Sequence, residues 1–176
     1  LKVLVRVSFH TSISLDSHSF SHPKGIEIFR ESLDKLDYQD DPRHVLQDVV
    51  DRTSLIINDG DQYSFLHKSI MEFYSAKFIA TRSYDAKKEI YKYISDNYNY
   101  KFENVLRFLK ELDPCCFYEY FVIYQVESSG LLDCFELEKI QKNIAIFMGF
   151  PLSIIYEKSN DYKHVRINDD NFSNKL

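Results

Sequence analysis

One segment of the sequence combines residue types suited to binding an anion, and it runs from Tyr63 to Ala80 as YSFLHKSIMEFYSAKFIA. Its start is typical of a β-strand and its remainder of a helix, so His67 falls at the junction, near the helix N-terminus. The first backbone N–H groups of a helix have no intrahelical acceptor and attract negative charge. His67 is therefore well positioned to join these amides around a phosphate, with Glu72 in the second turn. The plainer interpretation is that His67 caps or packs and that Glu72 is a solvated charge.

Motifs for catalysis are missing from the sequence. A phosphate loop of the GxxxxGK[ST] type needs two glycines five residues apart, and the only glycines are Gly25, Gly60, Gly130 and Gly149. The motifs GxGxxG, GxSxG and HExxH are also absent. We therefore predict that this chain has no catalytic residues, is not an enzyme, and holds no cofactor by itself.

Two groups of residues have spacings that resemble metal ligands. His18 and His22 are spaced H-x3-H, but no matching pair of cysteines is nearby and the segment between them is typical of a loop. Asn58, Asp59 and Asp61 cluster as in a calcium loop, but the full calcium-loop pattern is missing and a hairpin turn explains them. We predict no metal site.

Composition and cysteine content indicate the compartment and the partners. The three cysteines are Cys115, Cys116 and Cys134, an odd number without a CxxC pair, which favours a reducing, cytoplasmic location and buried apolar side chains. The opening LKVLVRVSFHTSISL is too short and too polar to span a bilayer, and no other segment is apolar enough. The net charge of -5 disfavours nucleic acid as the main partner.

The elements that position His67 are predicted to be three helices followed by a β-hairpin. The opening segment is a core helix or strand. Ser21 caps a second helix from Lys24 to Leu36, whose apolar residues step by three and four. A third helix follows at about Arg43 to Arg52. The runs SLIIND and DQYSFLH are then joined by Asp59-Gly60, a tight-turn signal, so the layout is that of a winged helix in which the hairpin is the wing.

Helical patterns continue after the hairpin. A long helix starts around His67, and its wide apolar surface indicates packing on more than one side. The segments YDAKKEIYKYI, KFENVLRFLKEL and ELEKIQKNIAIFM are amphipathic, and CFYEYFVIYQV is interpreted as helix from its neighbours. The fold class is thus mainly α. We predict a winged-helix domain over residues 1–82, a helical domain over 83–158, and a polar tail over 159–176 that is disordered or begins another domain.

The segment around His67 resembles the end of the winged-helix domain in NACHT proteins. These belong to the STAND class of P-loop signalling ATPases, which includes animal NOD-like receptors and many bacterial antiphage defence proteins. The residues that match the family pattern are Phe65, Leu66, His67, Ser69, Ile70, Glu72, Phe73, Tyr74 and Ala76. Met71 departs from it, since Gln is usual there.

The flanking segments extend the resemblance over about residues 1 to 112. RTSLIINDGDQY resembles the family's wing, with Thr53-Ser54 in place of Ser-Gly, and HSFSHPKGIEIFRESL resembles the preceding helix. KFENVLRFLKEL resembles the segment after the winged helix, with Phe102 where Trp is usual.

The resemblance implies a regulatory role in a larger parent chain. In such proteins an upstream ATPase domain binds ADP or ATP with Mg, and the winged-helix histidine, here His67, contacts the β-phosphate of ADP in the closed, inactive state. Exchange of ADP for ATP would release this contact, the winged helix would swing away, and the protein would form homo-oligomers. A downstream domain would sense the ligand. The resemblance implies innate immune or antiphage defence. Because the sequence has no segment apolar and long enough to span a bilayer, we expect no membrane partner.

Other functions are compatible with parts of the sequence. A winged-helix DNA-binding regulator needs a basic recognition helix, but RHVLQDVVDR carries Asp48 and Asp51 beside its arginines. A stand-alone helical interaction module would have no nucleotide role for His67. An enzyme of an unrecognised type would need perturbed titratable residues in a pocket.

Overall fold

The computed structural model describes most of the chain. The described residues are 1–15, 17–97, 100–128, 153–158 and 163–168. They fall into two compact units, Leu1–Val122 and Ile123–Leu176, each of which is described by itself.

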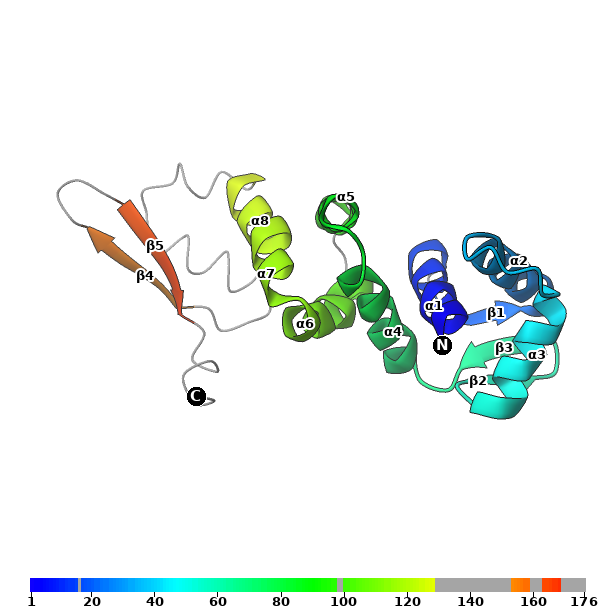
Figure 1. Cartoon of the computed structure of the whole chain (residues 1–176). Helices are drawn as coiled ribbons and strands as arrows, with labels where there is room; N and C mark the ends of the chain where they lie inside the picture. Colours follow the sequence, from blue (N-terminus) through cyan, green and yellow to red (C-terminus); the bar gives the residue numbers. More distant parts are fainter. Residues whose placement is uncertain (16, 98–99, 129–152, 159–162, 169–176) are drawn as a thin grey trace. The chain divides into compact units, whose positions relative to one another are not determined.

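The first unit is mainly helical with a small sheet (Figure 1). Its elements in chain order are α1 (Lys2–Ser14), β1 (Ser19–Ser21), α2 (His22–Asp34), α3 (Pro42–Thr53), β2 (Ile56–Asp59), β3 (Gln62–Phe65), α4 (Lys68–Ala80), α5 (Tyr84–Asp96), the 3-10 helix η1 (Tyr100–Phe102), α6 (Glu103–Leu112), α7 (Pro114–Cys116) and the π-helix η2 (Phe117–Val122). The predicted fold class, a mainly α winged helix followed by further helices, is confirmed.

The sheet has three antiparallel strands in the order β1-β3-β2. The predicted hairpin is β2 and β3, in which Ile56 pairs with Phe65 and Asp59 with Gln62. Strand β1, which the sequence analysis did not predict, pairs with the other edge of β3 and places Phe20 opposite Tyr63. Three residues are too few to show a period, so β1 left no signal in the sequence.

Gly60 closes the hairpin as predicted. It is the first of two loop residues between Asp59 and Gln62, and its φ is 65°, a backbone angle that only glycine adopts without cost.

The core of the winged helix forms between the sheet and the helices around it. Alternation along β3 buries Tyr63 and Phe65 on one face. The buried members of this core are Leu4, Val7, Phe20, Ile28, Phe29, Leu46, Ile56, Tyr63, Phe65 and Met71. The opening segment is therefore a core helix, and Met71 brings the start of α4 into the same core.

Helix α2 has Ser21 at its N-cap position as predicted, but it begins at His22 and ends at Asp34, two residues earlier at each end than the predicted Lys24 to Leu36, with Pro23 in its first turn. The Ser21 side chain makes no capping hydrogen bond. The apolar face of α2 buries Phe29 and Leu33 as the spacing predicts. Ile28 is buried as well, whereas Ile26 is only partly buried.

Helix α4 packs on several sides, as predicted. It contacts α1 and α6 most extensively, and α1 lies between α2 and α4 (Figure 1). The side of α4 that is buried includes Met71, Phe78 and Ile79. Leu66 precedes the helix and is 48% exposed.

The helices after α4 confirm the predicted helical segment as far as residue 128. KFENVLRFLKEL forms α6, which buries Val105, Leu106 and Leu109 but leaves Leu112 exposed. The apolar run CFYEYFVIYQV is helical throughout, and six of its residues form η2.

The second unit contains the helix α8 (Ile123–Ser128) and the antiparallel strands β4 (Ser153–Lys158) and β5 (Lys163–Asn168). The predicted helical domain over 83–158 and polar tail over 159–176 did not include these strands, and the first unit continues past residue 82 to Val122. The helix predicted in ELEKIQKNIAIFM lies outside the described residues.

Candidate functional site

His67 lies at the N-cap of α4, directly after the last strand of the winged helix. Only Leu66 separates it from β3, and its backbone is extended, with φ −142° and ψ 141°. The His67 side chain is exposed and makes no capping hydrogen bond to the helix. The imidazole therefore remains available beside the first amides of α4, which a helix leaves without intrahelical acceptors.

Glu72 is buried, contrary to the expectation of a solvated charge. Its side chain is 2% exposed, and its carboxylate lies 3.4 Å from Nζ of Lys68 and accepts a hydrogen bond of 3.0 Å from Nδ2 of Asn104. Lys68 comes from the same turn of α4, whereas Asn104 belongs to α6. Glu72 is on the same helix as His67, but its carboxylate is engaged with these two partners.

The charges around His67 favour an anion. Lys68 is half-exposed and follows His67 directly, but its ammonium group already lies 3.4 Å from the buried carboxylate of Glu72. The helix dipole contributes positive potential at the start of α4. The exposed imidazole of His67 and the first amides of α4 are thus the groups at this helix start that could contact a phosphate.

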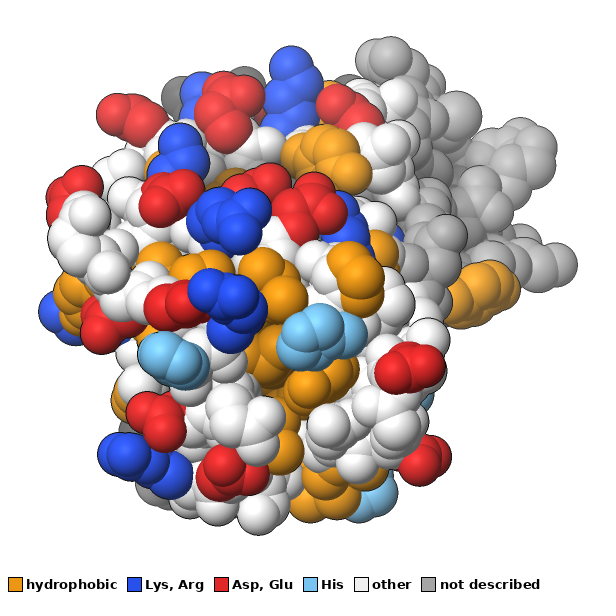
Figure 2. All heavy atoms as spheres, turned by 90° about the vertical axis from the view of Figure 1, so that its right-hand side faces the viewer, with side chains coloured by type: hydrophobic (Ala, Val, Ile, Leu, Met, Phe, Trp, Pro, Cys, Tyr) orange, Lys and Arg blue, Asp and Glu red, His pale blue; other side chains and the backbone are white. Residues whose placement is uncertain are grey.

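The third helix does not present a basic surface. Arg43 is paired with Asp41 at 2.7 Å, and Arg52 with Asp48 at 3.3 Å. The Arg43 guanidinium lowers the pKa of Asp41 to about 2. Figure 2 shows acidic and basic side chains interspersed on the face where the winged helix is seen end-on. These pairs disfavour DNA phosphates as the partner of α3, because its arginines are already neutralised.

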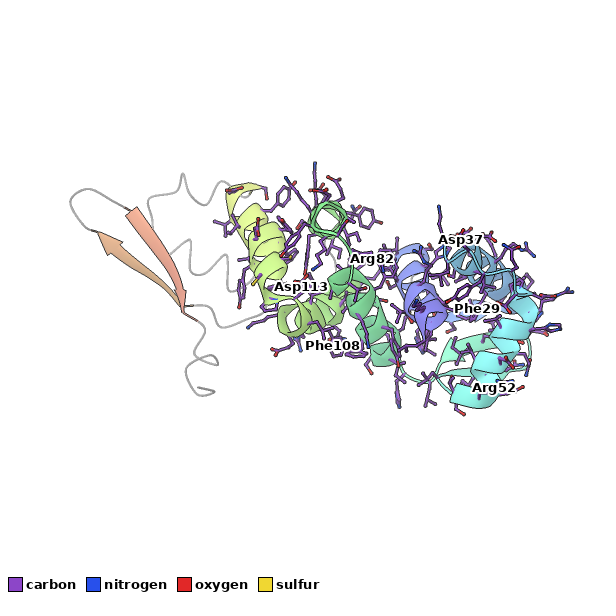
Figure 3. The ribbon with its side chains drawn as sticks, in the orientation of Figure 1. Phe29, Asp37, Arg52, Arg82, Phe108 and Asp113 are labelled. Carbon is purple, nitrogen blue, oxygen red and sulfur yellow. The ribbon has the colours of Figure 1, made fainter. Side chains whose placement is uncertain are left out.

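A second cluster of titratable groups was not found from the sequence. Nζ of Lys87 in α5 lies 2.8 Å from Oδ2 of Asp113, the residue before α7, and 3.8 Å from Sγ of Cys116. The Tyr91 hydroxyl is buried nearby and has no hydrogen-bond partner among the described residues. Figure 3 marks Asp113 at this position, near the start of α7.

The environment shifts the pKa of three of these groups upward. Burial, together with the negative charge of Asp113, raises the pKa of Tyr91 and of Cys116 above their ordinary values. Burial opposes the charged form of Lys87, but the attraction of Asp113 outweighs it and raises the pKa of Lys87. The cluster thus keeps a neutral thiol and a neutral phenol beside a closed ion pair, which stabilises the packing of α5 on α7 rather than activating a nucleophile. Lys87 and Asp113 are 26 positions apart in the sequence, and only the fold brings them together.

The other residues considered from the sequence do not assemble into a site. Nδ1 of His22 is hydrogen-bonded to the Tyr63 hydroxyl at 3.1 Å, and His18 is only partly buried. Within the part of the chain that the structure describes, no three His, Cys, Asp or Glu side chains are grouped to hold a metal ion. Cys116 is buried as predicted, but Cys115 is exposed because the short helix α7 turns it outward. Cys134 lies outside the described residues.

Comparison of the chain with protein-family models, curated proteins and solved structures gave no match in any of the three. Among the described residues, no helix combines the length and the apolarity that crossing a membrane requires.

Proposed function

We propose that this chain is the regulatory winged-helix and helical segment of a NACHT-type STAND signalling ATPase. In this proposal it holds the ADP-bound inactive state and couples nucleotide exchange to oligomerisation in a cytoplasmic defence protein. The fragment itself carries no phosphate loop, so the nucleotide and its Mg belong to an upstream ATPase domain of the same parent chain.

The observation that carries the proposal is the position of His67. An exposed histidine lies at the start of α4, without a side-chain capping hydrogen bond and two residues after the end of β3, in a winged helix of three helices and a wing. This is the place that the resemblance assigns to the phosphate-contacting histidine. The positive end of α4 favours the same ligand.

The proposed switch depends on a contact that exists only while ADP is present. One hydrogen bond from His67 to a charged phosphate stabilises the closed state by roughly 1.5–3 kcal/mol, or about ten- to a hundredfold in population. The buried carboxylate of Glu72 would hold the second turn of α4 against α6, so that release of His67 from the nucleotide moves both helices. A ligand-sensing domain downstream would act on the same equilibrium.

The test begins with the coding sequence upstream of Leu1 and continues with the full-length protein. A GxxxxGK[ST] loop and an acidic Walker B strand upstream are expected. The full-length protein is then purified with and without His67→Ala, and its bound ADP is quantified after denaturation. We expect the variant to lose ADP about ten- to a hundredfold faster than the native protein.

His44→Ala is the matched control, because His44 is an exposed histidine on α3 of the same winged helix. It should retain ADP like the native protein. If the two variants behave alike, or if no ATPase core precedes the chain, the nucleotide role is refuted and a helical interaction module becomes the better account.

A further inference from the structure

Two arginines from different elements share one aromatic ring. Cζ of Arg6 in α1 lies 5.2 Å from the centroid of Phe78, and Cζ of Arg82, just after α4, lies 4.4 Å from the same centroid. Phe9 stacks on this ring at 4.2 Å. Figure 3 shows Arg82 at the junction between α4 and α5, on the side toward α1. The two guanidinium groups are close enough for the charge of Arg82 to act on Arg6.

No carboxylate among the described residues balances these two charges. Arg82 donates only to the carbonyl oxygen of Phe78 at 3.3 Å and to the hydroxyl of Thr81 at 3.5 Å. Nε of Arg6 is buried without a hydrogen-bond acceptor. Burial and the charge of Arg82 both lower the pKa of Arg6. Most buried polar groups in proteins are satisfied, so a buried guanidinium nitrogen beside a second cation lacks an anion.

An open groove adjoins Arg6 between α1 and α2. Its volume is about 470 Å³, within the size range of small-molecule sites. Phe9 and Ile13 give it an apolar wall. Ser32 also lines it, is 1% exposed, and has a hydroxyl without a hydrogen-bond partner among the described residues.

The remaining charges of the groove lie along its α2 side. Glu31 is exposed and engaged with Nδ1 of His10 at 3.4 Å, and Asp34 and Lys35 are exposed residues of opposite sign. Arg6 supplies the positive charge on the α1 side of the groove, and the charge of Arg82, which does not itself line the groove, acts on Arg6 from beside it. An anionic group would therefore be held at Arg6, and an apolar body would lie along Phe9 and Ile13.

We propose that Arg6 and Arg82 form a binding site for a small organic anion, a carboxylate or phosphate attached to an apolar group. The planar guanidinium groups match the oxygen pairs of either anion. The buried hydroxyl of Ser32 supplies a further hydrogen bond inside the groove. This site is separate from His67 and does not depend on the proposed nucleotide switch.

The test uses the native chain and four probes: phenyl phosphate, benzoate, inorganic phosphate and benzyl alcohol. Binding is followed through the Nε–H resonance of Arg6 by nuclear magnetic resonance, at concentrations up to about 10 mM, where a millimolar site is near saturation. Phenyl phosphate and benzoate are expected to shift this resonance saturably. Inorganic phosphate should bind at least several-fold more weakly, and benzyl alcohol should not move the resonance.

Two variants distinguish binding at a specific site from non-specific attraction between opposite charges. Arg82→Gln should weaken the binding of phenyl phosphate about tenfold or more. Arg52→Gln should leave this affinity unchanged, because Arg52 is an exposed arginine on α3 that is paired with Asp48. The Arg82 side chain lies at a helix end, so its replacement leaves the core intact. Failure of both anions to shift the Arg6 signal, equal binding of inorganic phosphate, or an equal loss in Arg52→Gln would each overturn the proposal.

Discussion

Replacement of Gly25 by alanine tests how tightly β1 is packed against α2. Gly25 is buried in α2, and a Cβ at this position would lie 2.9 Å from Cδ2 and from Cε2 of Phe20. Ordinary van der Waals contact begins at about 3.4 Å, the distance from the same Cβ to Cδ2 of Leu46. The Phe20 ring would therefore have to move by about half an ångström, and it is 4% exposed and packed between Tyr63 and Phe65.

Two opposing contributions set the size of the effect. Alanine favours a helix interior over glycine by about 1 kcal/mol. Overpacking a well-filled core costs about 1–3 kcal/mol. We expect Gly25→Ala to lower the free energy of unfolding by about 1 kcal/mol, since the rigid ring of Phe20 cannot turn away as a flexible chain end would.

The assay is urea unfolding of four proteins: native, Gly25→Ala, Phe20→Leu and the double variant. Leucine lacks the ring atoms that the new Cβ would meet, so Gly25→Ala should become neutral or stabilising once Phe20 is replaced. The coupling between the two positions should be about 1 kcal/mol or more. If Gly25→Ala stabilises the native background as much as the leucine background, β1 does not pack on α2 as described.

Three further results are expected. Lys87→Met should destabilise the chain by about 3 kcal/mol in urea unfolding, because it leaves the Asp113 carboxylate buried without its partner, and Lys87→Arg should cost clearly less. The folded state raises the pKa of Cys116, Tyr91 and Lys87, so the contribution of these groups to the free energy of unfolding is complete below about pH 9 and is lost as the pH rises. A free energy of unfolding that stayed constant up to about pH 11 would contradict this. Gly60→Ala should destabilise the hairpin by about 1 kcal/mol through backbone strain alone, since its Cβ meets no atom, and a neutral result in thermal unfolding would refute the turn geometry.

The winged helix could be predicted because each of its main elements carries a local signal. Pro23 and Pro42 mark the starts of α2 and α3, and Asp59-Gly60 marks the turn. Strand β1 carries none of these signals. It exists because β3 offers a free edge and because the winged-helix core has room for Phe20, and both conditions arise only after the chain has folded.

The candidate site could be located from the sequence but its surroundings could not. The hydrophobic pattern changes near His67 from that of a strand to that of a helix, which predicts a helix start at this residue. In the structure His67 is the N-cap and the helix begins at Lys68. Burial of Glu72 depends on Asn104, which lies 32 positions further along on α6. Periodicity describes one helix at a time, so it cannot reveal that a charged residue on an otherwise apolar helix faces a second helix that supplies its hydrogen bond.

Helix α4 belongs to the winged helix and to the helices that follow it. Met71 lies in the core of the winged helix, while Glu72, the next residue, is hydrogen-bonded to Asn104 of α6. Phe78 packs against Phe9 of α1 near the other end of α4. A hinge at residue 82, the predicted domain boundary, would have to break the contacts of α4 with α6 without loosening those with α1. The motion proposed for His67 would therefore carry Leu1–Val122 as one compact unit rather than hinge at residue 82.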